Sequence, residues 1–128
     1  MSTPATRPAE ATYDSPADLA TVREFVRAEA TALGLSRLRA DLLAVAVSEL
    51  ATNTLQHTAG DGRVRVWPAD DRLYCEVIDQ GTARTFGRVM PAADAVRGRG
   101  LAIVERSCDE IEVSAEADGT HVRLGLFR

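Results

Sequence analysis

After about residue 58 of this 128-residue chain, the spacing of the apolar residues changes from the period of a helix to the alternation of a strand. Over residues 19–30, and again over about 37–58, apolar residues recur at helical spacing. The segments 63–67 and 73–78 instead alternate in polarity, and the turn-forming residues 68–71 join them. The pattern predicts two helices followed by a β-hairpin.

Residues that are typical of helix ends flank the two helical segments. Ser15 is typical of a helix N-cap, with Pro16 in the first turn and the acid Asp18 at the third position. Gly34 predicts that this helix ends near residue 33, and Ser36 is the expected cap of the next one. The second helix is apolar nearly all round its middle, so we expect it to be the buried one.

The rest of the chain predicts one more helix and a second hairpin. Residues 101–108 have the pattern of a short helix, and residues 111–114 and 121–126 flank the turn Asp118-Gly119 as strands. No strand alternates with a crossover helix along the chain. We therefore expect an α+β fold, a two-layer sandwich in which helices pack on one face of a mainly antiparallel sheet.

The composition limits the class of protein. Hydrophobic residues make up 45% and charged residues 27% of the chain, which is typical of a globular protein with a real core. The net charge of −4 argues against direct nucleic-acid binding, and no apolar run approaches the roughly 18 residues of a membrane span. We predict one domain over residues 15–128, preceded by a flexible tail, 1–14, with a short edge strand near Thr12-Tyr13 as an option at its end.

The two cysteines and residues 1–10 indicate the cellular compartment of the protein. Residues 1–10 lack the apolar segment of a secretion signal. Cys75 and Cys108 show no CxxC spacing and lie in apolar runs, so we expect both to be small core residues. A cytoplasmic location follows from these two features.

A polar pair interrupts the apolar second helix. Glu49 and Asn53 are four residues apart, so they share one face of the helix with Leu42, Val45 and Ala46. That face is expected to be buried, and a buried carboxylate is costly unless it is paired or bound to a ligand. A carboxylate can act as a general base, and an amide oxygen suits Mg²⁺, which shares its oxygen ligands with substrate phosphates.

Each member of this pair also has a purely structural interpretation. Glu49 can be an exposed helical residue, or can pair with Arg37 or Arg39. Asn53 can bond to a helix carbonyl. His57, one turn further on, is more often a histidine that interacts with the end of a helix than a catalytic one.

Two further segments have the chemistry of a ligand site. Asp79 follows a strand, where it either forms a turn or accepts a hydrogen bond from an exocyclic amine such as that of adenine. Gly98-Arg99-Gly100 stands between the aperiodic segment 80–97 and a predicted helix, and is either a hinge or an anion site at the helix start. A loop as long as 80–97 is usually a lid or binding loop, or is disordered. Thr120, after Asp118-Gly119, is most simply a residue entering a strand.

These pieces occur in an order that resembles the GHKL ATPase family, whose ATP site is called the Bergerat fold. The resemblance is greatest to single-domain anti-sigma-factor serine/threonine kinases and their histidine-kinase-like relatives in bacteria, and it covers about residues 15–128. Each motif is weak alone, but four in order are fairly specific. The motifs, in chain order, are Glu49-x-x-x-Asn53, Asp79-Gln80-Gly81, Gly98-Arg99-Gly100-Leu101 and Gly119-Thr120.

The resemblance implies a role for each matching position. Glu49 matches the general base, Asn53 the Mg²⁺ ligand and Asp79 the carboxylate that recognises adenine. Gly98 and Gly100 match the phosphate-contacting glycines at the end of an ATP lid, residues 82–97, and Thr120 matches a residue that helps to hold the adenine region. The implied ATP-binding set comprises Asn53, His57, Asp79, Gly81, Ala83, Gly98, Arg99, Gly100, Leu101 and Thr120.

The chain departs from the family at one position. The first glycine box of the family reads DxGxG, and Ala83 replaces its second glycine. If Ala83 must adopt a positive φ, the cost is roughly 1 kcal/mol, and its methyl group could crowd the nucleotide. The lid also carries Arg84, Arg88 and Arg97, any of which could reach a phosphate.

Three functions follow from these observations. The first is an ATP- and Mg²⁺-dependent protein serine/threonine kinase that phosphorylates a small anti-sigma antagonist partner and sequesters a sigma factor when that partner is absent. The second is a non-catalytic nucleotide sensor or protein-interaction module, with a homodimer as one form, and the altered glycine box favours it. The third is a generic domain without a ligand.

Overall fold

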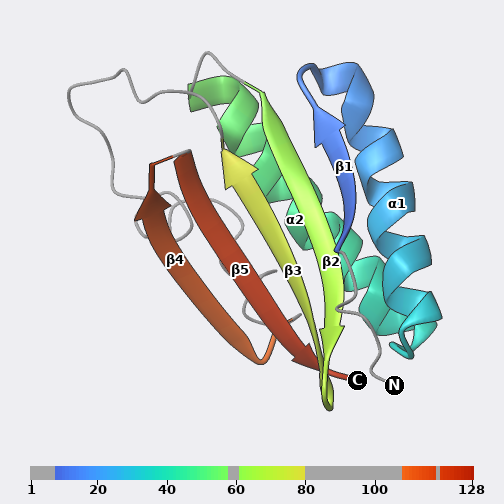
Figure 1. Ribbon diagram of the computed structural model, residues 1–128. Coiled ribbons are helices and arrows are strands. Elements are labelled where there is room, and N and C mark those ends of the chain that lie inside the picture. The colour runs from blue at the N-terminus through green and yellow to red at the C-terminus, as the bar shows by residue number, and fades with distance from the viewer. Residues whose placement is uncertain (1–7, 58–60, 80–107, 118) are drawn as a thin grey trace.

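The computed structural model describes residues 8–57, 61–79, 108–117 and 119–128. Within these residues, two α-helices lie on one face of a five-stranded sheet whose strand order is β1-β2-β3-β5-β4 (Figure 1). Every pair of neighbouring strands is antiparallel, so the predicted α+β sandwich is confirmed. The elements are β1 Ala9–Tyr13, a 3₁₀ turn Pro16–Asp18, α1 Leu19–Ala32, α2 Arg37–His57, β2 Gly62–Ala69, β3 Arg72–Asp79, β4 Glu110–Glu116 and β5 Gly119–Phe127.

The predicted helix ends are confirmed. The Asp18 carboxylate accepts hydrogen bonds from the backbone N–H groups of Asp14 (2.9 Å) and Ser15 (3.3 Å), which fixes the turn that leads into α1. Gly34 has a φ of +106°, the left-handed conformation that lets the chain leave α1. The Ser36 hydroxyl accepts from the backbone N–H of Arg39 at 3.2 Å and so begins α2.

The core lies between the two helices and the sheet. Helix α1 contributes Val22, Val26 and Ala30, each fully buried, and the strands contribute the alternate residues that face the helices. Cys75 is fully buried among them and Cys108 packs against them, as predicted. Among the described residues no helix is both long and apolar enough to cross a membrane.

Helix α2 packs against the core, as predicted for the buried helix, but only one of its sides is buried. Leu43 and Val47 face the core and are fully buried. Leu38 is 68% exposed, and Leu42 and Val45 are exposed at 37% and 39%. The sequence pattern could not separate the two sides because both carry apolar residues.

The first strand is longer than expected. β1 pairs with β2 along its whole length, from Ala9 opposite Val66 to Tyr13 opposite Gly62. Tyr13 is 1% exposed and belongs to the core, so this segment is part of the sheet. The third predicted helix, 101–108, lies outside the described residues except for Cys108.

Candidate functional site

One row of residues crosses the end of the sheet on the face that the helices cover. Tyr13 of β1 pairs with Gly62 of β2, Gly62 pairs with Asp79 of β3, and Asp79 pairs with Thr120 of β5. The residues two positions along these strands, Val64, Val77 and Val122, are buried in the core; since side chains alternate along a strand, the row faces the same side. The two strand residues singled out from the sequence, Asp79 and Thr120, are therefore direct neighbours.

The C-terminal half of α2 ends at the same edge of the molecule. In Figure 1 the last turns of α2, the end of β3 and the beginning of β5 lie together at the top, and α2 packs against β3. Asn53 is 8% exposed and its neighbour Thr54 7%, and the Thr54 hydroxyl donates to the backbone carbonyl of Leu50 at 3.3 Å. The buried amide predicted at Asn53 is confirmed.

Glu49 does not share that burial. Its side chain lies on the exposed side of α2, in line with Leu42 and Val45. The expectation of a buried carboxylate is therefore wrong. Leu42, Val45 and Glu49 of the predicted stripe face outward, whereas Ala46 and Asn53 are buried. Arg39, one of the partners considered for Glu49, instead forms an ion pair with Asp109 at 3.1 Å.

The residue before Glu49 is fixed by α1. The Ser48 hydroxyl accepts a hydrogen bond from the Arg23 guanidinium at 3.0 Å, and the Ser48 carbonyl accepts one from the Thr52 hydroxyl at 2.8 Å. A second polar contact between the helices joins Arg27 to Asp41 at 2.6 Å. These contacts hold α2 against α1 around the turn that presents Glu49.

Tyr13 is the buried polar residue that sequence reasoning missed. Burial raises the pKa of its hydroxyl to about 12, with smaller contributions in the same direction from the carboxylates of Asp79 and Asp61, while the nearby Thr54 hydroxyl acts in the opposite direction. The pKa of this hydroxyl is thus influenced both by Asp79 at the end of β3 and by Thr54 on α2. The signal in the sequence was a glycine near the start of a strand, Gly62, which marks a close approach of other atoms.

The remaining predicted site residues are only partly described. His57 is the last residue of α2, and its side chain is outside the described residues. The predicted lid, 82–97, also lies outside the described residues. The same is true of six site residues implied by the resemblance: Gly81, Ala83, Gly98, Arg99, Gly100 and Leu101.

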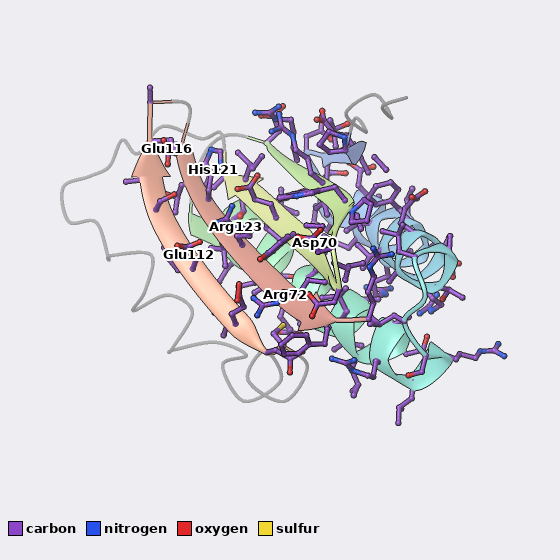
Figure 2. The ribbon with its side chains drawn as sticks, turned by 60° about the horizontal axis from the view of Figure 1, so that its bottom comes forward. Asp70, Arg72, Glu112, Glu116, His121 and Arg123 are labelled. Carbon is purple, nitrogen blue, oxygen red and sulfur yellow. The ribbon has the colours of Figure 1, made fainter. Side chains whose placement is uncertain are left out.

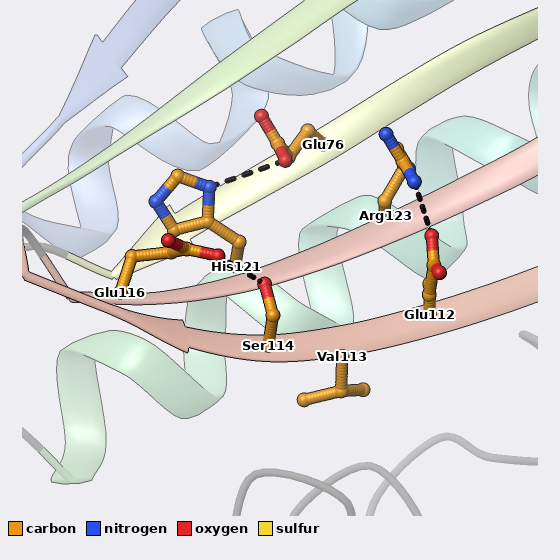
Figure 3. A pocket seen from close by; sticks show the side chains of 7 residues that line it. All are labelled: Glu76, Glu112, Val113, Ser114, Glu116, His121 and Arg123. Atoms are coloured by element: carbon orange, nitrogen blue, oxygen red, sulfur yellow. Dashed lines mark hydrogen bonds and ion pairs between the residues drawn. The ribbon is translucent and has the colours of Figure 1, made fainter.

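A separate hollow of about 330 Å³ opens on β3, β4 and β5 and contains none of the predicted site residues. Figure 2 shows Glu112 and Glu116 on β4 beside His121 and Arg123 on β5. In Figure 3 the His121 ring points to Glu76, with Nδ1 3.1 Å from a carboxylate oxygen, while Arg123 pairs with Glu112. The polar groups here largely satisfy one another, and no cluster of His, Cys, Asp or Glu within the described segments is arranged to hold a metal ion.

A comparison with protein families finds a match that spans the predicted site residues. The family described as the histidine kinase-like ATPase domain matches residues 13–126, from the last residue of β1 to the penultimate residue of β5. This chain belongs to that family. Its members are ATPase domains, so membership implies that ATP is the ligand, and the match includes the Tyr13–Gly62–Asp79–Thr120 row.

A solved structure has the same fold. It is a crystal structure of the RsbU and RsbW domains of Rv1364c from Mycobacterium tuberculosis, which superposes with a TM-score of 0.68 at 23% sequence identity. The alignment covers 95% of the present chain and 32% of the solved chain, so the present chain spans about a third of the length of the solved one. At this identity the likeness shows the fold alone. No curated protein matches the sequence.

Proposed function

We propose that this ATPase domain is a protein serine/threonine kinase of the anti-sigma type. It binds ATP at the end of the sheet beneath α2 and transfers the terminal phosphoryl group to a hydroxyl of a small antagonist protein. When that partner is absent, it sequesters a sigma factor. The observation that carries the proposal is the meeting of Asp79, Thr120 and the buried end of α2 at one edge, in a chain of this family.

The two ends of the nucleotide are assigned to different elements. The Asp79 carboxylate accepts a hydrogen bond from the exocyclic amine of adenine, and Thr120, its neighbour across the sheet, contacts the same region. The phosphates extend toward α2. The buried amide of Asn53 fits a Mg²⁺ ligand, because its oxygen is a hard neutral donor and is held in a polar turn beside Thr54. The ion supplies charge stabilisation of the phosphates when it is bound.

The exposure of Glu49 suits the role of general base toward another protein. A general base must come within hydrogen-bond reach of the hydroxyl whose proton it accepts. The acceptor hydroxyl here belongs to a separate chain, so a carboxylate at the surface of α2 is accessible to it, and Asn53 lies one turn away along the same helix. The acceptor hydroxyl gives its proton to a Glu49 oxygen as its own oxygen bonds to the terminal phosphorus of ATP. The bond from that phosphorus to the bridging oxygen breaks, and ADP leaves.

The proposal is tested by separating binding from transfer. Calorimetry with ATP and ADP, with and without Mg²⁺, measures whether the site binds nucleotide. Phosphotransfer to candidate antagonist proteins is then compared between wild type and Glu49→Gln, which keeps the size of the side chain. We expect Glu49→Gln to bind ATP normally and to transfer phosphate at least about 100-fold more slowly.

Two controls sharpen this test. Glu29→Gln, on α1 and away from the site, is expected to transfer phosphate at the wild-type rate. Asn53→Ala is expected to reduce the dependence of ATP affinity on Mg²⁺. A Glu49→Gln variant that is folded but no longer binds ATP would contradict the assigned role.

The second function is a nucleotide-binding module without catalysis, and Ala83 in the first glycine box favours it. The same measurements distinguish the two. ATP binding with no transfer to any antagonist protein supports the module, whereas absence of ATP binding contradicts both functions.

A further inference from the structure

The strongest unexplained feature of the site is the hydroxyl of Tyr13. The residue is 1% exposed, and among the described residues its Oη has no hydrogen-bond partner of acceptable geometry. A buried polar atom without a partner is costly, and such atoms in a native fold need an explanation. Tyr13 was not among the predicted site residues, and the proposed reaction does not use it.

The position of the ring is fixed by a glycine. A Cβ atom added at Gly62 would lie 2.2 Å from the Tyr13 Oη and 2.3 Å from its Cζ. The ring therefore leaves β1 and lies across β2 over Gly62, in the space where any other residue would place a side chain. Since neighbouring strands are about 4.8 Å apart, a hydroxyl above Gly62 is one strand away from Asp79.

The hydroxyl can act only as a neutral group at ordinary pH. Its pKa, raised to about 12, keeps the proton on the oxygen, so Tyr13 presents an O–H donor. The carboxylates of Asp79 and Asp61 are the negative groups that act on it, and an ionised carboxylate accepts several hydrogen bonds. Asp79 is the one that shares its row on the sheet.

We propose that Tyr13 is a positioning residue of the base site, whose hydroxyl donates to the Asp79 carboxylate through one water. It thereby fixes the orientation of the carboxylate that accepts a hydrogen bond from the exocyclic amine of the base. This inference rests on the proposed function, because it assumes that Asp79 recognises the base. If it is right, Tyr13 contributes to the preference of the site for a base that carries an exocyclic amine. A base with a carbonyl at that position would place an acceptor against the same carboxylate.

The test compares ATP with inosine triphosphate, whose base has a carbonyl where adenine has its amine. Tyr13→Phe keeps the ring over Gly62 and removes only the hydroxyl. We expect its affinity for ATP to fall about ten-fold, with no change for inosine triphosphate, because a hydrogen bond to a charged group is lost. The variant should remain folded, because Phe keeps the ring that fills the space over Gly62.

Two further variants make the result specific. Tyr74→Phe removes the other tyrosine hydroxyl, beside Trp67 on the opposite face, and should leave both affinities unchanged. In an Asp79→Asn background, Tyr13→Phe should cause less than about two-fold additional loss, because the two residues act through one interaction.

The outcomes separate this inference from the function on which it rests. If wild type binds ATP and prefers it to inosine triphosphate, but Tyr13→Phe behaves like wild type, the role of Tyr13 is overturned and the proposed function stands. If Tyr13→Phe weakens both nucleotides equally, the ring or the fold is responsible and the role is again overturned. If wild type does not bind ATP, the proposed function fails and the base role of Tyr13 fails with it.

Discussion

At the scale of single residues, the ring of Tyr13 packs closely over Gly62. Gly62→Ala would place a methyl group within 2.2–2.7 Å of three atoms of the tyrosine side chain. The ring is buried and cannot move outward, so we expect a loss of about 1–3 kcal/mol in the free energy of unfolding. Urea denaturation followed by circular dichroism measures it.

A double-mutant cycle shows whether this contact is the cause. With Tyr13→Val, which removes the ring, the additional cost of Gly62→Ala should fall below about 0.5 kcal/mol. An equal cost in both backgrounds would show that the backbone of Gly62, rather than the space above it, sets the requirement.

Tyr13 also makes stability depend on pH in the alkaline range. The folded state holds the proton of Tyr13 to a pKa of about 12, whereas the unfolded chain loses it at about 10.0. Stability from this group is fully present below pH 10 and is lost as the pH rises toward 12, since the unfolded state releases the proton first. By pH 11 wild type should lose about 1.4 kcal/mol that Tyr13→Phe does not lose. Urea titrations of both proteins at pH 8 and 11 measure the difference, and parallel curves would contradict it.

At the scale of the element, α2 has two unlike sides. Leu43 is fully buried against the core, whereas Leu38 is 68% exposed on the same helix. Leu43→Ala should therefore cost about 2–5 kcal/mol, the price of a cavity, and Leu38→Ala less than about 0.5 kcal/mol. Thermal or urea unfolding of the two variants measures the difference. Similar losses would mean that Leu38 is covered in solution.

The same helix shows why sequence reasoning succeeded for strands and failed here. In β2 the alternation of Val64 and Val66 with Arg63 and Arg65 separated the buried face from the open one, and the structure agrees. In α2 both sides carry leucine and valine, so the helical period could not show which side faces outward. The burial of Glu49 was inferred from that period and was wrong for this reason.

The full length of β1 was not predicted, for a different reason. Its sequence, Ala-Glu-Ala-Thr-Tyr, contains only one large apolar side chain, so alternation gave a weak signal. Pairing with β2 makes it a strand, and the partner Gly62 gives Tyr13 its place. These are long-range contacts that no local pattern contains.

At the scale of the whole molecule, the candidate site depends on register. Motif order predicted that Asp79 and Thr120 belong together, and the pairing of β3 with β5 places them opposite one another. Nothing in the local sequence placed Tyr13 two strands from Asp79, because that relation depends on how β1, β2 and β3 align. The roles assigned to residues in 80–107 stay predictions, since those residues lie outside the described ones.

A contact between distant segments joins both layers at the opposite end of the sheet. The Asp109 carboxylate accepts hydrogen bonds from the backbone N–H of Phe127 at 2.7 Å and from the Arg39 guanidinium at 3.1 Å. Arg39 also donates to the Phe127 carbonyl at 2.6 Å, so the start of α2 is joined to the end of β5. Asp109→Ala leaves an amide and a guanidinium without their acceptor, and because the groups are about one-third exposed, we expect a loss of about 1–2 kcal/mol.

A double-mutant cycle of Asp109→Ala and Arg39→Ala, measured by urea unfolding, tests whether this loss of stability comes from their contact. The double variant should lose less than the sum of the two single losses, because each single variant already breaks the shared contact. Asp71→Ala is a suitable control, since that carboxylate is 76% exposed and lies 4.0 Å from its partner Arg72, and it should change stability by less than about 0.5 kcal/mol. Losses that simply add would mean that Arg39 and Asp109 stabilise the protein independently, and that the contact between them contributes nothing to holding α2 on the sheet.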